Sequence, residues 1–197
     1  MSLITTLTRM WMTRSVRPFT FKNEYDQELP YAGCENLGLY IHIPFCRTIC
    51  SFCPYCKVRY DEELCSRYID ALLAEISMVG SQYQAQHGTR KTVTSLYFGG
   101  GSPALAADRI GEILDTVGEY FAVQEGIGLE LHPEDVTVPT LQRLKNAGIT
   151  KISIGIQSFQ EKYQDILGRK PVDGASMAAV LALLPLLRTV LHPVLHR

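Results

Sequence analysis

Residues 39–56 read LYIHIPFCRTICSFCPYC, an apolar run that leads directly into a group of cysteines. The first five residues are mainly β-branched, aromatic or aliphatic and end before Pro44, which predicts a buried strand. Four cysteines follow, at positions 46, 50, 53 and 56. Sulfurs at this spacing meet on one loop, and in a reducing compartment such a group is more typical of a metal site than of disulfides.

The pattern of a strand followed by a helix repeats along the rest of the chain. Apolar and β-branched runs predict three further strands, at residues 93–98, 127–131 and 151–156. Apolar residues at helical spacing predict a helix after each strand, at residues 61–80, 104–121, 137–147 and from residue 160 onward. Gly80 and Gly148 are expected to end the first and third helices. Four successive strand–helix units predict an α/β fold with a parallel sheet.

Chemically distinctive residues follow every predicted strand. The cysteines come after the first strand, and the glycines at positions 99–101 come after the second. Residues 130–133 end the third strand, and Gln157 follows the fourth. Because ligands of parallel α/β folds bind at the carboxyl ends of the strands, in open sheets and barrels alike, we expect one active site at that end.

The composition is that of a globular chain. Of its 197 residues, 46% are hydrophobic and 20% are charged, and the formal net charge of −1 gives no electrostatic reason to expect a nucleic-acid partner. Residues 1–22 are basic and weakly similar to an organelle transit peptide, but they lack the apolar core of a secretory signal, so we expect a cytoplasmic protein. Residues 177–195 are apolar, but Pro185, Arg188 and His192 interrupt them, and no membrane span is predicted.

Several short segments, all in the same order along the chain, resemble one known family. They are residues 40–46 (YIHIPFC) with Phe52 before Cys53, residues 98–103 (FGGGSP), Glu130, residues 154–159 (IGIQSF) and residues 167–169 (LGR). Together they resemble, over residues 37–172, the oxygen-independent coproporphyrinogen III oxidase and heme chaperone family of radical S-adenosylmethionine (SAM) proteins. The cysteine motif is highly specific, whereas the glycine run alone is a weak signal.

This resemblance implies a partial (β/α) barrel of the radical SAM type, with about four of its six strand–helix units present. It implies that Cys46, Cys50 and Cys53 hold a [4Fe–4S] cluster and leave one iron for the amine and carboxylate of SAM. One electron from a low-potential donor then cleaves SAM and releases a 5′-deoxyadenosyl radical. Oxidase-like members use this radical to abstract hydrogen from a porphyrinogen propionate, which loses carbon dioxide. We therefore expect a radical SAM oxidoreductase of porphyrin and heme metabolism, with a porphyrin or heme as its small-molecule partner.

The resemblance also assigns cofactor-binding residues, but no catalytic side chain. The assigned residues are Tyr40, Phe52, Gly100, Gly101, Ser102, Glu130, Gln157 and Arg169. Each has an ordinary structural alternative. Glycines after a strand expose backbone N–H groups to a ligand, but Ser102 followed by Pro103 also suits the capped start of a helix. Glu130 suits the ribose or amine of SAM, or a salt bridge to a lysine, and Arg169 suits a carboxylate or solvent.

Other interpretations of single residues stay open. Zinc is the main alternative for a short cysteine loop, and a disulfide loop is another. Oxidase-type members carry an extra cysteine two residues after the third ligand, so Cys56 departs from their pattern, and we expect it to stay off the cluster. Cys34 and Cys65 are expected to be buried thiols. His42 is expected to pack in the core, and His132 is a candidate for the site.

The resemblance divides the chain into an N-terminal arm at residues 1–38, a partial radical SAM core at residues 39–184 and an atypical tail at residues 185–197. Family members continue beyond Val172 with further strands and a domain that covers the substrate, so the resemblance suggests a truncated or frame-shifted product. Two alternatives to a radical enzyme remain. One is a heme-binding chaperone of the same family, and the other is a non-catalytic fragment that keeps the cysteine loop.

Overall fold

The computed structural model describes residues 31–168 and residue 178. The chain divides into two units, residues 1–30 and residues 31–197, and everything described below belongs to the second unit. Arg169 and the predicted tail at residues 185–197 lie outside the described residues. The domain boundaries at residues 38 and 184 stay predictions.

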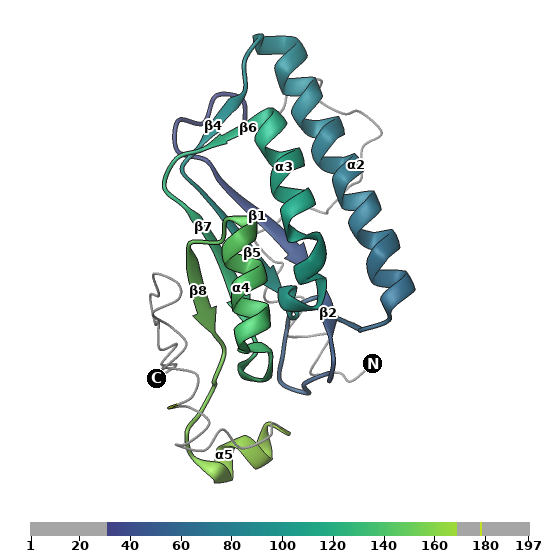
Figure 1. Cartoon of the computed structure of the whole chain (residues 1–197), viewed down its shortest axis with the longest axis vertical. Helices are drawn as coiled ribbons and strands as arrows, with labels where there is room; N and C mark the ends of the chain where they lie inside the picture. The colour runs from purple at the N-terminus through teal and green to yellow at the C-terminus, as the bar shows by residue number, and fades with distance from the viewer. Residues whose placement is uncertain (1–30, 169–177, 179–197) are drawn as a thin grey trace, which may run out of the picture. The chain divides into compact units, whose positions relative to one another are not determined.

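A four-stranded parallel sheet forms the centre of the described part. Its strands are β1 (Gly38–Ile43), β5 (Ser95–Gly100), β7 (Ile127–Leu131) and β8 (Lys151–Ile154), in the order β1-β5-β7-β8. Every pair is parallel, so all four arrows in Figure 1 point the same way, toward the bottom of the view. The predicted parallel α/β arrangement is confirmed, and the sheet with its helices forms part of a barrel.

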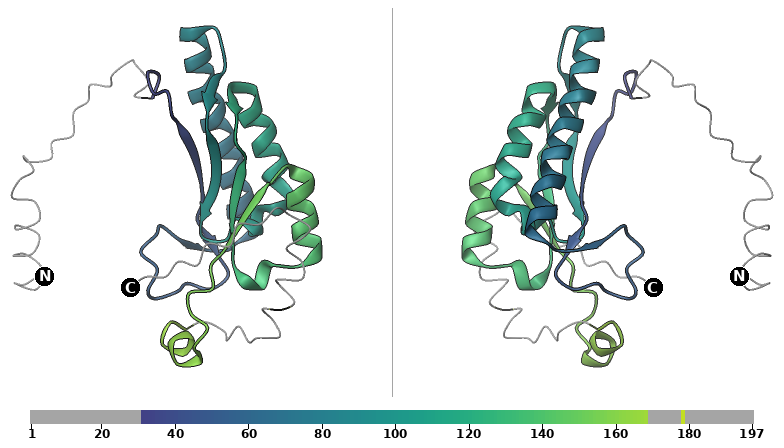
Figure 2. Two further views of the ribbon diagram at one scale, coloured as in Figure 1. Left: turned by 90° about the vertical axis from the view of Figure 1, so that its left-hand side faces the viewer. Right: turned by 90° about the vertical axis from the view of Figure 1, so that its right-hand side faces the viewer.

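Helices cover one face of this sheet. They are α2 (Glu62–His87), α3 (Ile110–Tyr120) and α4 (Val138–Ala147), and the side views of Figure 2 show all three on the same side. A 3-10 helix, Pro103–Arg109, leads into α3, and the short helix α5 (Glu161–Ile166) lies beyond the carboxyl ends of the strands. Within the described ranges, no helix has the length and apolar character that crossing a membrane requires.

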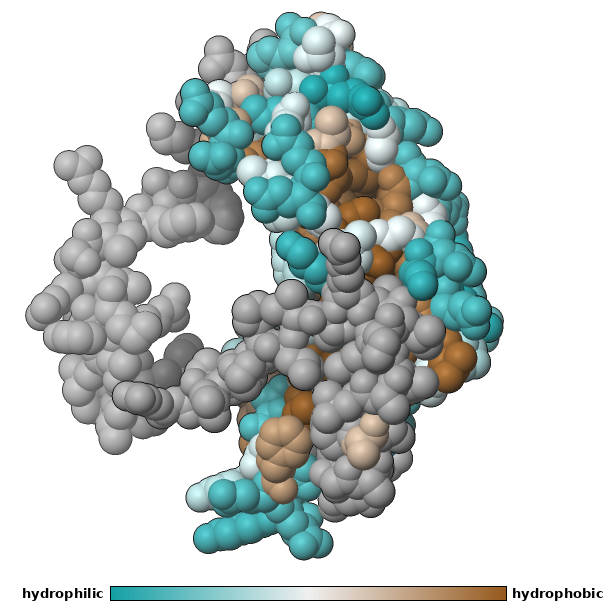
Figure 3. All heavy atoms as spheres, turned by 60° about the vertical axis from the view of Figure 1, so that its left-hand side comes forward, coloured by the Kyte–Doolittle hydropathy of each residue, from teal (hydrophilic) through white to brown (hydrophobic). Residues whose placement is uncertain are grey.

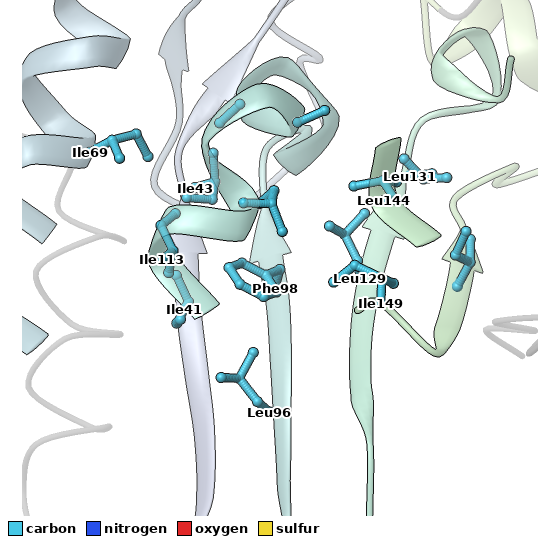
Figure 4. Packing of buried hydrophobic residues seen from close by; sticks show 14 of the residues in the cluster. Ile41, Ile43, Ile69, Leu96, Phe98, Ile113, Leu129, Leu131, Leu144 and Ile149 are labelled. Carbon is cyan, nitrogen blue, oxygen red and sulfur yellow. The ribbon is translucent and has the colours of Figure 1, made fainter. Parts of the chain in front are cut away.

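The core lies between the sheet and these helices. Successive residues of a strand point to opposite faces, so alternate positions of each strand face the helices. The buried residues shown in Figure 4 include Ile41, Phe98 and Leu129 from the strands and Ile113 and Leu144 from the helices. Burial of one such side chain stabilises the fold by about 1.5–3 kcal/mol. The intervening strand residues face away from the helices and form the open face of the sheet.

The end of α2 corrects one sequence prediction. Gly80 does not end this helix, which continues to His87 and ends at Gly88 with a φ of 71°. Gly80 is buried where α2 meets α3, and a Cβ at position 80 would overlap the ring of Tyr120. The glycine is therefore needed for close helix packing. By contrast, Gly148 ends α4 as predicted, with a φ of 102°.

Two short parallel ladders flank the main sheet. At one end β4 (Lys91–Val93) pairs with β6 (Phe121–Val123), so the single strand predicted at residues 93–98 is divided at Thr94 into β4 and β5. At the other end β2 (Phe45–Cys46) pairs with β3 (Val58–Arg59). This second ladder brings together the two ends of the cysteine loop, residues 46–57.

Candidate functional site

The cysteine loop is closed at its base by backbone hydrogen bonds. The amide of Val58 donates to the carbonyl of Pro44 at 2.8 Å, and the amide of Tyr60 donates to the carbonyl of Cys46 at 2.9 Å. Because β2 follows β1 after a single proline, the loop starts at the carboxyl end of the sheet. The fold therefore places the cysteines beside the glycine turn, residues 99–102.

Lys57 holds the far side of the cysteine loop. Its ammonium donates to the carbonyl of Cys50 at 2.8 Å and also to the carbonyl of Cys53. The side chain is half-buried. A positively charged side chain therefore lies within the loop that carries the three predicted cysteine ligands.

The glycine turn packs directly against the cysteine loop. A Cβ at position 101 would overlap the carbonyl of Phe45 and would lie 2.8 Å from the sulfur of Cys46. The amide of Gly101 donates to the carbonyl of Ile43, and that of Ser102 donates to Phe45, both at 2.7 Å. These two amides are therefore not presented to a ligand, contrary to the prediction, because the tight contact with β1 and β2 uses them.

Asp135 joins the glycine turn to the cysteine loop. It follows β7, and its side chain is only 5% exposed. One carboxylate oxygen accepts hydrogen bonds from Nε and Nη2 of Arg47, at 3.3 and 3.0 Å, and the other accepts the hydroxyl of Ser102. Ser102 precedes Pro103 at the start of the 3-10 helix as predicted, but its hydroxyl does not cap that helix, since it binds Asp135 instead.

A cavity of about 490 Å³ lies at the carboxyl ends of the strands. This volume falls within the usual range for small-molecule sites. Most of the predicted site residues line it: Cys46, Cys50, Phe52, Cys53, Gly100, Gly101, Ser102, Glu130 and Gln157. His132 lines the cavity too, and Cys56 is not among its lining residues. Gly168 reaches the cavity, whereas its neighbour Arg169 lies outside the described residues.

Tyr40 lies on the open face of the sheet rather than in the cavity wall. Its ring stacks on Tyr97 at 6.4 Å between centroids, and its hydroxyl is 3.3 Å from Nδ1 of His42. His42 is half-buried, and its Nε2 is 2.9 Å from the carbonyl of Cys56. Since a carbonyl only accepts, Nε2 is the donor in this contact. Burial, and also the negative charge of Glu130, raise the pKa of both tyrosines above the usual value.

Gln157 adopts an unusual backbone conformation in the cavity wall. Its φ is 71°, the only left-handed value outside glycine among the described residues. Such a conformation costs an ordinary residue about 1–2 kcal/mol. Strain of this kind persists where the surrounding structure imposes it, and it is common at functional sites.

The donor chemistry of the loop fits an iron–sulfur cluster. None of the six cysteines forms a disulfide, which removes the disulfide alternative. Three of them line one cavity, half-buried, and thiolates are the usual protein ligands of such clusters. Within the described ranges, no three or more His, Cys, Asp or Glu side chains are grouped so that they could hold a metal ion. Outside the loop, Cys65 is buried as predicted, whereas Cys34 is exposed on a turn.

Sequence reasoning missed four charged residues of the cavity wall, namely Arg47, Lys57, Glu134 and Asp135. Arg47 and Lys57 flank the cysteines in sequence, so their proximity to the motif is a signal that could have identified them. Asp135 comes five residues after Glu130, and nothing in the local pattern distinguishes it from an exposed turn residue.

Comparisons with known proteins identify the family of this chain. The model of the Radical SAM superfamily matches residues 40–196. The anaerobilin synthase of Escherichia coli O157:H7 is 34% identical over 146 residues, covering 73% of this chain and 32% of that protein. The oxygen-independent coproporphyrinogen III oxidase of Paracoccus denitrificans is 34% identical over 139 residues, covering 68% and 30%. The heme chaperone HemW of Bacillus subtilis is 28% identical over 134 residues, covering 66% and 34%.

A solved structure agrees with these sequence matches. Coproporphyrinogen III oxidase (HemN) from Escherichia coli, a radical SAM enzyme, matches with a TM-score of 0.66 and 28% identity, covering 79% of this chain and 36% of that one. The chain spans about a third of the length of the curated relatives that it matches. Because the superfamily model and the HemN fold both match most of its length, this chain belongs to the radical SAM superfamily, with relatives among the oxygen-independent coproporphyrinogen III oxidases and the HemW heme chaperones.

Proposed function

We propose that this chain binds a [4Fe–4S] cluster through Cys46, Cys50 and Cys53 and binds SAM in the adjoining cavity. The observation that carries the proposal is the shared cavity: three cysteines of one loop meet residues that follow the other three strands of the sheet. Three thiolates leave one iron of a cube-shaped cluster without a protein ligand. When bound, the two groups together supply one-electron chemistry on an organic substrate.

The residues of the cavity divide the task of holding SAM. Glu130 offers a carboxylate to the ribose or amine, and Gln157 offers a carboxamide from beyond the end of the neighbouring strand β8. Phe52 is 37% exposed and lines the cavity beside the three cysteines. Gly101 leaves room beside the sulfur of Cys46. Tyr40 contributes from the open face, where its hydroxyl is held by His42.

The reaction that we propose is coproporphyrinogen III oxidase-like, in porphyrin and heme metabolism. Its support is the likeness to the Paracoccus oxidase and to the HemN structure. The proposal includes a low-potential electron donor and a cytoplasmic location, because thiol ligands require reducing conditions. The open face of the sheet, beside the cavity, supplies the aromatic side chains of Tyr40 and Tyr97 for a flat, apolar substrate.

Heme binding and transfer is the second candidate function. It is favoured by the likeness to HemW and by Tyr55, which stands two residues after Cys53, where oxidase-type members carry an extra cysteine. Tyr55 is 64% exposed at the cavity rim. Titration with heme, followed by absorption spectroscopy, separates the two functions: stoichiometric binding without turnover of a porphyrinogen favours the chaperone.

The direct test is anaerobic reconstitution of the purified chain with iron and sulfide. We expect four irons and four sulfides per chain, and an electron paramagnetic resonance spectrum of the reduced protein that shifts when SAM is added. Reductive formation of 5′-deoxyadenosine is the expected activity. Serine at position 46, 50 or 53 is expected to abolish iron binding, while Cys34→Ser, on the exposed turn, serves as the matched control. Zinc in place of iron, under strictly anaerobic handling, contradicts the proposal.

A further inference from the structure

Asp135 is a buried carboxylate that accepts hydrogen bonds from both the cysteine loop and the glycine turn. Its side chain is 5% exposed, although an aspartate is rarely buried without compensating partners. Arg47 donates two hydrogen bonds to one oxygen, and Ser102 donates to the other. Both carboxylate oxygens are therefore used by side chains from elsewhere in the sequence, at separations of 88 and 33 residues.

The two partners belong to different parts of the candidate site. Arg47 is the neighbour of Cys46 at the start of the cysteine loop, and Ser102 ends the glycine turn. Asp135 itself lies in the turn after β7, five residues from Glu130. One carboxylate thus connects the turns that follow β1, β5 and β7, and all three residues line the same cavity.

We propose that Asp135 is a positioning residue that couples the cysteine loop to the glycine turn, so that binding at the cysteine loop and binding in the cavity lined by the glycine turn strengthen each other. A loop ordered by its ligand holds Arg47 or Ser102 in place, and the shared carboxylate then orders the other loop before its own ligand arrives. Such coupling is reciprocal, because the same free energy links both binding events. The identity of the two ligands, cluster and SAM, rests on the proposed function.

A purely structural ion pair is the competing explanation. Removing one partner of a buried pair destabilises a protein wherever the pair lies, because the other group is left uncompensated. If Asp135 couples the two loops, the loss of protection should instead be confined to those loops. The amides of Gly101 and Ser102, each bonded at 2.7 Å across to β1 or β2, should become less protected together with the cysteine loop, while the distant ladder β4–β6 should keep its protection.

The first measurement is hydrogen exchange of the full chain without added cofactors. Asp135→Asn keeps the shape of the side chain and removes its charge. Arg47→Gln removes the hydrogen bonds between the loops at a side chain that is 58% exposed. Because Arg47 is exposed, this second variant remains folded and measurable if Asp135→Asn does not fold. The control is Asp108→Asn, which removes an exposed ion pair with Arg143. We expect faster exchange at residues 46–57 and 99–102 in the first two variants and no change in the control. Unchanged exchange in those segments overturns the proposal.

The second measurement is SAM affinity by equilibrium dialysis, before and after anaerobic reconstitution with iron and sulfide. In the wild-type chain the cluster should strengthen SAM binding. Asp135→Asn should reduce that gain by about tenfold, in line with the loss of charge-assisted hydrogen bonds. The double variant Asp135→Asn with Arg47→Gln should show the same SAM affinity as Asp135→Asn alone, since both substitutions act through one carboxylate.

The outcomes separate this inference from the proposed function. A wild-type chain that assembles no four-iron cluster contradicts the proposed function, and the exchange data then decide the positioning role of Asp135 alone. A wild-type chain that assembles the cluster, with Asp135→Asn equal to Asp108→Asn in SAM affinity and in the resonance shift caused by SAM, contradicts the coupling and leaves the proposed function intact.

Discussion

At the scale of single residues, one residue of the site adopts a backbone conformation that lowers stability but directs the residue into the cavity wall. Gln157 is held with a φ of 71°, a conformation that glycine adopts without strain. The strained backbone directs this residue into the cavity wall beside Gly155, whose own Cβ position would lie 3.3 Å from the Gln157 amide nitrogen. The sequence pattern offers no reason to expect strain there.

Gln157→Gly should therefore stabilise the protein while weakening the site. Relief of about 1–2 kcal/mol of strain exceeds the roughly 0.4–1 kcal/mol that glycine loses through greater freedom of the unfolded chain. We expect the free energy of unfolding, measured by urea denaturation, to rise by roughly 0.5–1 kcal/mol. Gln124→Gly is the matched control, because Gln124 is an exposed loop residue without a positive φ and its replacement should lower stability. A drop in both variants contradicts the strain argument.

Lys57 provides a second prediction at this scale. Its ammonium bonds the carbonyls of Cys50 and Cys53, and hydrogen bonds to a charged group contribute about 1.5–3 kcal/mol each. Lys57→Met keeps the aliphatic stem but releases the loop, so the reconstituted protein should retain severalfold less iron after gel filtration. Lys145→Met, on the exposed surface of α4, should retain as much iron as the wild type. Equal retention in both variants would show that Lys57 is dispensable.

At the scale of elements, the contact between α2 and α3 depends on one small residue. Arg109 bonds Asp70 on α2 at 2.9 Å and also pairs with Glu112 on α3, so charged groups join the two helices at their solvent edge. The hydrogen bond from Arg109 lowers the pKa of Glu112. Closer to the core, Gly80 admits the ring of Tyr120.

Gly80→Ala should destabilise the protein, although alanine is the better helix former. The added methyl group overlaps Tyr120, and overpacking of this kind costs about 1–3 kcal/mol. Gly118→Ala, in α3, is the control, since a Cβ there meets nothing within 4 Å and should raise stability by about 0.5–1 kcal/mol. Thermal denaturation followed by circular dichroism measures both changes, and a shift of the same sign in the two variants would contradict the packing argument.

At the scale of the whole molecule, the buried core and the open surface lie on different faces of the sheet. The helices cover one face of the sheet (Figure 2). The other face carries the stacked rings of Tyr40 and Tyr97. Figure 3 shows apolar side chains reaching the surface of the described part between hydrophilic ones. Large exposed apolar residues also occur around the cavity, among them Phe52 and Tyr55, and on the segment of Phe159, Tyr163 and Ile166.

Hydrogen exchange should reflect this division. The central strands β5 and β7 are paired on both sides and carry fully buried side chains such as Phe98 and Leu129, so their amides should exchange most slowly. The amides of α5 and of the cysteine loop should exchange fastest. Mass spectrometry of the exchanged protein measures this order, and exchange of β5 as fast as that of α5 would contradict the fold.

The sequence alone was sufficient for the fold class and for most of the cavity. The run at residues 39–56, three further β-branched runs and the residues after them predicted a parallel sheet with one site at its carboxyl end, and the structure has this sheet with a cavity at that end. These signals are local: a strand, a turn or a cysteine loop is specified by residues a few positions apart. For the same reason Thr137 and Gly148 could be recognised as the ends of α4.

Only the tertiary structure decided how the turns at the carboxyl end of the sheet are joined. Local patterns suggested that Gly80 ends a helix, that the amides of Gly101 and Ser102 face a ligand and that residues 93–98 form one strand, and each prediction failed at a contact between distant elements. Asp135 meets Arg47 across 88 residues of sequence. Such a pairing depends on the order of strands in the sheet and on the depth of burial, which no pattern of neighbouring residues contains.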